Sequence, residues 1–306
     1  MLPRLWNCPW ALLVLGNLFW AGNVIVGRAI LGPVPPIALS FWRWALAFCV
    51  AFGFARQNLR RDWPTLRAHW KMMVLLAATG IAFFNTAAYI GLSGTTALNV
   101  LLLQSCLPLI VLIWTLLLFK EQPNGWQLVA VAISLLGVAF VAAHGSWSAL
   151  LSLQFHTADL WILAAATIYG VYIVMLRRRP DVHPLSFLQV AMGLGALMVA
   201  PFYLWELSRG ARFNGGWECY LGIGYMAVFP SFISYLFFNR GVQLLGGARA
   251  GQSTHLMPLF GSIMAVVFLG ESLHFYHLIG VMLIGSGILL AQLKAQPAPI
   301  IPATPE

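Results

Sequence analysis

Residues 91–137 decide the fold, and they read GLSGTTALNVLLLQSCLPLIVLIWTLLLFKEQPNGWQLVAVAISLLG. The same skeleton returns without a gap in residues 241–287, which read GVQLLGGARAGQSTHLMPLFGSIMAVVFLGESLHFYHLIGVMLIGSG. The most informative matches, which are more than a shared apolar residue, are Gly91 and Gly241, Pro108 and Pro258, Glu121 and Glu271, and Gly137 and Gly287. A proline, a glutamate and two glycines in one register predict that the chain is an internal duplication.

The composition places this duplicated chain in a membrane. Hydrophobic residues make up 60% of it and charged residues 8%, which is too little polar side chain to cover a soluble globular surface. The apolar runs are continuous, as in membrane helices, and do not alternate as barrel strands do. We expect an all-α membrane protein of ten transmembrane helices, at about residues 10–28, 36–55, 72–92, 97–119, 126–143, 158–176, 185–207, 217–238, 250–269 and 274–292.

Basic residues predict the orientation of these spans. With a cytoplasmic N-terminus, thirteen of the 17 Lys and Arg residues fall on the cytoplasmic side: Arg4, Arg56, Arg60, Arg61, Arg67, Lys71, Lys120, Arg177, Arg178, Arg179, Arg240, Arg249 and Lys294. The opposite side has only Arg28, Arg209 and Arg212. This bias predicts cytoplasmic N- and C-termini. Topology and anionic lipid account for the net charge of +9, so we expect the lipid bilayer as a partner and no nucleic acid.

The duplication assigns five of the ten expected helices to each repeat. We expect a first five-helix repeat in residues 1–143, a linker loop in residues 144–157, a second repeat in residues 158–292 and a disordered tail in residues 293–306. Because five is odd, the second repeat would be inverted in the membrane relative to the first. Inverted repeats are typical of carriers that work by alternating access. The alternative is a duplication that only builds a large bundle.

Several short motifs point to a known family. They are Gly22-Asn23 and Gly27-Arg28, Pro35-Pro36 followed by Phe41-Trp42-Arg43, Pro108 with Glu121, and Pro258 with Leu269-Gly270-Glu271. With these motifs the chain resembles the drug/metabolite transporter superfamily, specifically its EamA-type ten-helix exporters, over roughly residues 10–292. The resemblance implies a multi-pass protein of the cell inner (plasma) membrane. It also implies export of amino acids, nucleobases or other metabolites, without selecting one cargo.

The first span has a small, polar face. Gly16, Trp20, Asn23 and Gly27 recur at spacings of four, three and four residues, which places them on one side of a helix. This face is either a close helix contact through the glycines or a cavity wall with Trp20 as a stacking surface. The repeat mate of Trp20 is Tyr169, again aromatic, which favours a cavity flanked by rings.

The third and eighth spans carry a second pair of polar positions. Asn85 and Tyr89 share a helix face, and the equivalent positions are Tyr235 and Asn239, the same two residue types exchanged. These groups either hydrogen-bond a polar substrate near the membrane centre or bond to one another and to backbone.

Arg43 is the clear charge inside a span. A charge at that depth is expensive and marks a candidate functional site, with an anionic substrate group as its partner. The alternative is an arginine that snorkels or bonds to a helix end. Glu121, Glu271 and Asp159 lie near helix ends, where we expect structural roles: hydrogen bonds from the amides of the next helix or contact with a basic loop residue.

Two prolines and one histidine complete the candidate set. Pro108 and Pro258 remove a backbone hydrogen bond inside their spans, so each is a candidate hinge. His255 is either a group that titrates near neutral pH and couples transport to protons or a packed buried histidine.

The sequence argues against an enzyme. It contains no HExxH, GxSxG, P-loop or dinucleotide-binding motif, and its four cysteines have no metal-ligand spacing, so we expect no cofactor and no metal. The predicted function is alternating-access export of a small polar metabolite, such as an amino acid. A channel or a lipid scramblase is the alternative. The coupling ion, and the choice between monomer and homodimer, stay open.

Overall fold

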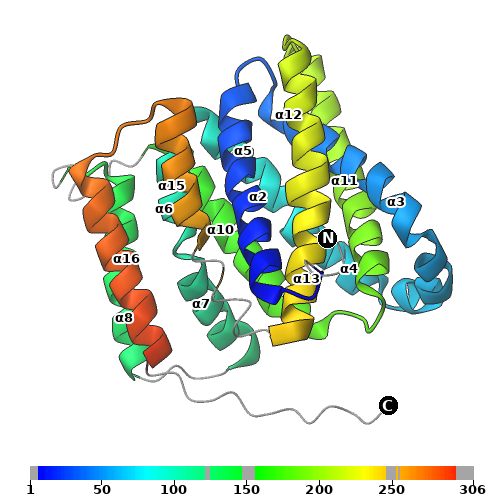
Figure 1. Ribbon diagram of the computed structural model, residues 1–306, viewed down its shortest axis with the longest axis horizontal. Coiled ribbons are helices and arrows are strands. Elements are labelled where there is room, and N and C mark those ends of the chain that lie inside the picture. Colours follow the sequence, from blue (N-terminus) through cyan, green and yellow to red (C-terminus); the bar gives the residue numbers. More distant parts are fainter. Residues whose placement is uncertain (1–5, 121–124, 147–155, 246–252, 254–255, 294–306) are drawn as a thin grey trace.

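The computed structural model describes residues 6–120, 125–146, 156–245, 253 and 256–293. In these residues the chain is helical, with no strand longer than one isolated bridge (Figure 1). The helices of the first part are α2 (Pro9–Ile30), α3 (Pro36–Ala68), α4 (Trp70–Ala77), η1 (Ala78–Ala82), α5 (Phe83–Gly94), α6 (Ala97–Gln104), α7 (Leu107–Phe119) and α8 (Gly125–Ala142). Those of the second are α10 (Thr157–Met175), η2 (Leu176–Arg178), α11 (Pro184–Ser208), α12 (Trp217–Val228), η3 (Phe229–Ile233), α13 (Ser234–Leu245), α15 (Leu256–Leu269) and α16 (Phe275–Leu293).

Many of these helices suit a membrane. Six helical stretches of the described chain are long and apolar enough to cross one: α2, α3, Trp70–Gly94, Thr157–Arg178, α11 and Trp217–Gly241. The bent pair α6 and α7 makes a seventh if it counts as one span, and three shorter apolar helices lie in Leu128–Val141, Leu256–Leu269 and Phe275–Gly287. The beginning of α2 and the end of α16 lie on the same side of the bundle (Figure 1).

The duplicated glycines lie where helices touch. A Cβ atom at Gly91 would lie 2.8 Å from the Ala158 carbonyl oxygen of α10, and one at Gly241 would lie 2.6 Å from Leu13 of α2. Gly137 and Gly287 both lie in the contact between α8 and α16, where added Cβ atoms would approach Leu283 to 2.8 Å and the Ala130 carbonyl to 2.6 Å. Close backbone approach therefore explains the glycine part of the repeat.

Two of the spans have the same kind of internal break. In the stretch Trp70–Gly94, the π-helical turn η1 replaces regular α-helix, and Thr79 and Asn85 bond to carbonyls of the same turns. In the stretch Trp217–Gly241, η3 contains Pro230, which has no N–H to donate, and Ser231 and Ser234 donate to the carbonyls of Met226 and Phe229. Both breaks turn polar side chains inward at corresponding places in the chain.

The expected bend at Pro108 is present. The segments Ala97–Gln104 and Leu109–Phe119 meet at 40°, and Pro108 is the second residue of α7. Proline cannot donate to the carbonyl four residues earlier, that of Gln104, where α6 ends. Pro258 is the third residue of α15, and residues 254–255 before that helix lie outside the described chain. Whether either proline acts as a hinge stays a prediction.

Carboxylates join α3 to α11 at both ends. Glu206, near the end of α11, accepts hydrogen bonds from the amides of Ile37 (3.1 Å) and Ala38 (2.7 Å) in the first turn of α3. Asp62, near the end of α3, accepts one from the amide of His183 (3.0 Å), which precedes α11. The two helices are therefore antiparallel, and each supplies an acid to the positive N-terminal end of the other.

Glu271 has the kind of role that its position predicts but a different partner. Its carboxylate accepts from the amides of Ala97 (2.7 Å) and Leu98 (2.9 Å), the first residues of α6. The helix that it caps belongs to the first half of the chain, whereas the sequence pointed to the next helix along. The matched Glu121 lies outside the described residues.

Candidate functional site

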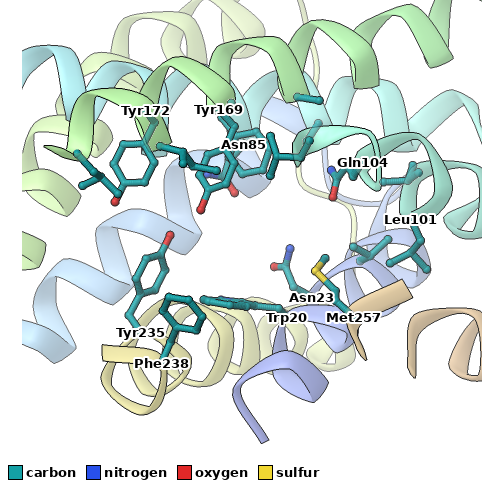
Figure 2. Close-up of a pocket in the computed structure, with 18 of the residues that line it drawn as sticks. Trp20, Asn23, Asn85, Leu101, Gln104, Tyr169, Tyr172, Tyr235, Phe238 and Met257 are labelled. Atoms are coloured by element: carbon teal, nitrogen blue, oxygen red, sulfur yellow. The ribbon is translucent and has the colours of Figure 1, made fainter. Parts of the chain in front are cut away.

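A cavity of about 580 Å³ lies among α2, α3, α5, α6, α7, α10, α11, α13 and α15 (Figure 2). The predicted site residues that line it are Trp20, Asn23, Arg43, Asn85, Tyr89, Tyr169, Tyr235 and Asn239, together with the candidate hinge Pro258. The structure thus brings together groups from both halves of the chain. His255 lies outside the described residues.

Arg43 is the centre of the polar wall. Its Nε donates to Ser231 Oγ (2.7 Å), and its Nη1 donates to Asn85 Oδ1 (2.8 Å) and to the Tyr89 hydroxyl. The Tyr89 hydroxyl in turn donates to Asn23 Oδ1 (3.1 Å). One guanidinium therefore connects α2, α3, α5 and η3.

The charge of Arg43 has neutral neighbours. The side chain is 3% exposed, its Cζ lies 4.6 Å from the centre of the Trp44 ring, and its hydrogen-bond acceptors are a hydroxyl, an amide and a phenol. In the described part of the chain, no carboxylate forms an ion pair with it. Among the described residues that line the cavity are Arg43 and Arg179 but no aspartate or glutamate. A buried cation compensated only by dipoles is an attractive site for an anion.

Aromatic rings form the rest of the wall. Tyr169 and Tyr172 of α10 face Trp20, Tyr235 and Phe238 across the cavity (Figure 2). The Trp20 ring centre lies 5.7 Å from that of Tyr235 and 5.4 Å from that of Phe238. The indole N–H of Trp20 donates to the Pro230 carbonyl (3.0 Å), a group that the break in η3 leaves accessible. These rings offer flat apolar surface beside the Arg43 charge.

The face of the first span combines a close helix contact with a cavity wall, the two arrangements that the sequence left open. A Cβ at Gly16 would lie 3.5 Å from the Ser234 carbonyl, and one at Gly27 would lie 3.4 Å from the Tyr89 ring, so the glycines pack against neighbouring helices. Trp20 and Asn23, between them, line the cavity. Asn85 and Tyr89 likewise bond to protein groups and face the cavity.

Sequence reasoning missed several residues of the site. Tyr172 and Phe238 each follow a predicted residue by three positions, so helical periodicity had the signal to find them. Ser231 and Arg179 had no such signal, because they meet the site only through tertiary packing. Gln104 also points into the cavity, opposite Met257 (Figure 2).

Comparisons with known proteins agree on one family. The model of the EamA-like transporter family matches two segments, residues 9–143 and 156–293. Similar proteins include the uncharacterized transporter YyaM of Bacillus subtilis, 24% identical over 92% of this chain and 92% of that protein. The uncharacterized inner membrane transporter YicL of Salmonella typhimurium is 24% identical over 73% of each chain. A probable terminal-alkyne amino-acid exporter of Streptantibioticus cattleyicolor is 26% identical over 88% of this chain and 87% of that one.

The fold also has a match among solved structures. One crystal structure superposes with a TM-score of 0.61 at 18% sequence identity, and the match covers 95% of this chain and 99% of the other. At that identity the likeness shows the fold alone. The apolar helices and the transporters among its relatives place the protein in the inner membrane as a multi-pass protein. Because the family model matches nearly the whole chain, the protein belongs to the EamA-like transporter family of the drug/metabolite transporter superfamily.

Proposed function

We propose that the protein exports a small polar metabolite with an anionic group, such as an amino acid, and binds it in the cavity beside Arg43. The observation that carries this proposal is a buried guanidinium whose hydrogen-bond partners, in the part of the chain that the structure describes, are all neutral. A substrate carboxylate in the cavity would supply the missing negative charge and form charge-assisted hydrogen bonds. The relative named as a probable terminal-alkyne amino-acid exporter supports the choice of an amino acid.

The cavity residues then have separate tasks. Arg43 would hold the anionic group, with Asn23, Asn85 and Tyr89 holding the guanidinium in place. Trp20, Tyr169 and Tyr235 would contact the apolar part of the substrate, and Asn239 would add a polar contact from α13. His255 stays a candidate for substrate or proton binding, as the sequence predicts.

We further propose ten spans in two inverted repeats that exchange conformations. In support, the two segments that match the family model split the chain near its middle. Helix contacts also correspond between the halves: α2 packs against α13 and α15, while α10 packs against α5 and α7. The π-helical breaks and the reciprocal carboxylate caps of α3 and α11 follow the same two-fold relation. Pro108 and Pro258, at corresponding positions, are the proposed bending points.

The cavity is best explained as the cytoplasm-facing state. Arg179 and Pro184, at the connection between α10 and α11, line it, and the distribution of basic residues assigns that connection to the cytoplasm. Of the described residues, those that connect α5 to α6 and α8 to α10, at the opposite end, do not line it. An exporter in this state would take its substrate from the cytoplasm.

Thermal unfolding of the purified protein with a panel of amino acids, nucleobases and uncharged analogues tests the proposal. A ligand that binds only the folded state stabilises it by about 2.7 kcal/mol at a hundredfold excess over its Kd. We expect anionic or zwitterionic compounds to raise the Tm of the wild type and of Arg209→Gln, an exposed-arginine control, but not of Arg43→Gln. Equal stabilisation of all three proteins would place the site elsewhere, and no stabilisation by any compound would favour a channel or a scramblase.

A further inference from the structure

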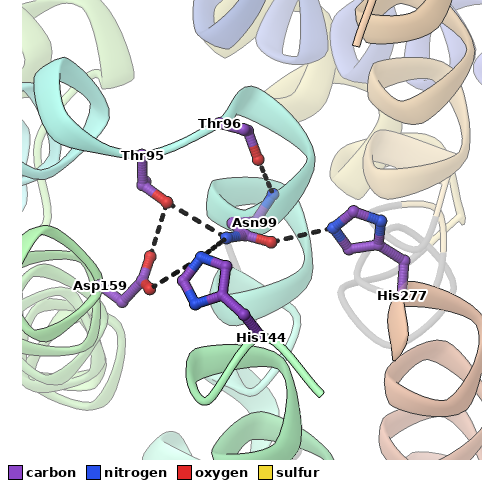
Figure 3. A network of polar contacts seen from close by, with 6 residues as sticks. All are labelled: Thr95, Thr96, Asn99, His144, Asp159 and His277. Carbon is purple, nitrogen blue, oxygen red and sulfur yellow. Dashed lines mark hydrogen bonds and ion pairs between the residues drawn. The ribbon is translucent and has the colours of Figure 1, made fainter. Parts of the chain in front are cut away.

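A second buried polar cluster lies outside the cavity. It consists of Thr95, Asn99, His144, Asp159 and His277 (Figure 3), and we call it the Asn99 cluster. These residues come from the connection before α6, from α6, from the turn just after α8 and from the first turns of α10 and α16. None of the five lines the cavity around Arg43, so substrate binding does not account for them.

Asn99 is the hub of the cluster, and its hydrogen bonds have a defined direction. Its amide nitrogen donates to Thr95 Oγ1 (3.2 Å) and lies 3.0 Å from His144 Nε2. Its amide oxygen lies 3.0 Å from His277 Nε2. Since both amide hydrogens are thereby used, His144 accepts at Nε2 and His277 donates from Nε2.

His277 has no place for another proton. Its Nδ1 accepts a hydrogen bond from the His274 amide (3.1 Å), while its Nε2 donates to Asn99. One ring nitrogen accepts and the other donates, which satisfies a neutral imidazole. Protonation would break the bond to His274, and the side chain is only 3% exposed. His277 is therefore a neutral structural member.

Asp159 is left with an incomplete set of partners. The residue is fully buried, and its Oδ1 accepts a hydrogen bond from Thr95 Oγ1 (2.7 Å). Its Oδ2 is buried and makes no hydrogen bond within the described chain. The start of α10 favours a carboxylate, as the sequence predicted, but the side-chain hydrogen bond comes from a residue before α6. A buried carboxylate oxygen without a donor is costly.

His144 faces that oxygen. Its Nε2 lies 3.8 Å from Asp159 Oδ2, too far for a hydrogen bond. Its Nδ1, the position of the hydrogen in the neutral ring, is buried without a partner in the described chain. The side chain is 35% exposed in total, so water can reach part of the ring. The pair thus combines a proton acceptor, an unsatisfied carboxylate and access to solvent.

We propose that His144 and Asp159 form a proton-binding site. The proton comes from hydronium, which leaves as water, and bonds to His144 Nε2. The Asn99 amide then loses its acceptor, and the new N–H turns to Asp159 Oδ2 and closes the gap to a charge-assisted hydrogen bond of about 2.8 Å. The charge of the pair changes from −1 to zero, which removes the buried uncompensated charge. No other bond forms or breaks.

The other titratable groups near His144 and Asp159 do not form the proposed proton-binding site. The ring centre of His156 lies 4.5 Å from that of His144, and the ring centre of Tyr276 lies 5.9 Å from it. Glu271 is bound to the first amides of α6, and His274 stacks against Tyr276 with 5.5 Å between the ring centres. Arg28 donates to the carbonyls of Leu92 and Ser93 at the end of α5. His156, which is exposed, is the group whose titration must be separated from that of His144.

Proton binding would change which helices are connected. In the described state, His144 ties the end of α8 to α6, and after proton uptake it would tie the end of α8 to α10. Both α6 and α10 are walls of the cavity, and the cluster lies at the end of the bundle that the basic residues assign to the outside. This consequence for transport rests on the proposed function, whereas the proton site itself does not.

Histidine NMR of the full-length protein in detergent tests the proton site directly. With ring-labelled histidine, the signal lost in His144→Gln identifies His144. We expect this signal to titrate in the wild type and in the control His69→Gln. In Asp159→Asn the proton affinity of His144 should fall by about tenfold or more, because an opposite charge at this distance favours the charged imidazole.

A second variant should change the proton affinity of His144 in the opposite direction. Thr95→Val removes the hydrogen bond to Asp159 Oδ1. The carboxylate is then stabilised more by a protonated His144, so the proton affinity of His144 should rise by about tenfold. Thr95→Val also keeps the test usable if Asp159→Asn does not fold. A His144 signal that stays constant wherever the protein is folded, or that titrates with one midpoint in all variants, would overturn the proposal. Because neither outcome involves transport, failure here is distinct from failure of the proposed function.

Discussion

Asn85 accepts a hydrogen bond of 2.8 Å from Arg43 at the position where a buried arginine would ordinarily meet a carboxylate. The amide differs from aspartate by a single group, so the chain has a neutral partner where a nearly isosteric anion would fit. The amide is itself fixed, since its nitrogen donates to the Ile81 carbonyl (3.0 Å) in the break of the third span. This arrangement keeps the charge of Arg43 available to a ligand.

Asn85→Asp is therefore expected to block the site from within. The new carboxylate would form an ion pair with Arg43, and the affinity for an anionic substrate should fall at least tenfold, since charge-assisted hydrogen bonds are worth about 1.5–3 kcal/mol. The unfolding temperature should change little, because the new ion pair offsets the lost hydrogen bond from the amide nitrogen to the Ile81 carbonyl. Ligand-induced shifts of the Tm measure both effects, and unchanged substrate affinity would indicate that Arg43 is purely structural.

Because Gly91 lies in a close helix contact, a larger residue at this position should lower the stability of the protein. In Gly91→Ala the added methyl group would lie 2.8 Å from the backbone oxygen of Ala158, so α5 and α10 must move apart, at a cost of about 1–3 kcal/mol. Gly224→Ala is the matched control, because a Cβ there meets no atom within 4 Å. Thermal unfolding of both variants measures the difference; equal Tm values would show that this helix contact tolerates a side chain.

The carboxylate cap at the start of α3 predicts a second effect on stability. Glu206→Gln replaces a buried charged acceptor of two amide hydrogen bonds by a neutral group with one acceptor oxygen. The free energy of unfolding should fall by about 1–3 kcal/mol. Glu218→Gln, at an exposed position in the first turn of α12, should change it by less than about 0.5 kcal/mol. If Glu206→Gln and Glu218→Gln changed the free energy of unfolding equally, the carboxylate cap would not stabilise the fold.

The orientation of the cavity can be tested by chemical labelling. In a variant without the four native cysteines, Arg179→Cys lies in the cavity wall and should react with a membrane-impermeant thiol reagent only from the cytoplasmic side. Arg212→Cys, between α11 and α12, should react only from the opposite side. Inverted membrane vesicles and intact cells separate the two directions. The reversed pattern would contradict the proposed topology.

The parts of the molecule that sequence reasoning found are those with a regular pattern. Gly91 and Gly137 stood out because their repeat mates, Gly241 and Gly287, meet the same packing requirement. Trp20 and Asn23, which line the cavity, stood out because helical spacing places them on one face. The ten spans and their inverted arrangement remain predictions.

Other parts depend on contacts between distant segments and leave no local signal. Ser231 meets Arg43 only because η3 interrupts its helix, and Glu271 caps a helix 174 positions earlier in the chain. The Asn99 cluster has no local signal for the same reason: the sequence predicts only a structural role for Asp159 near a helix end, and tertiary packing alone brings it and His277 to opposite sides of Asn99.

Counterflow in proteoliposomes is the most direct test of the central claim, that Arg43 binds an anionic group of the transported substrate. Vesicles loaded with unlabelled amino acid should take up the labelled compound saturably through the wild type and Arg209→Gln. Arg43→Gln should lower this exchange at least tenfold, and the carboxamide of the same amino acid, which lacks the carboxylate, should compete poorly with the amino acid. If Arg43→Gln exchanges the substrate as the wild type does, or if the carboxamide competes as well as the amino acid, Arg43 does not bind an anionic group of the substrate.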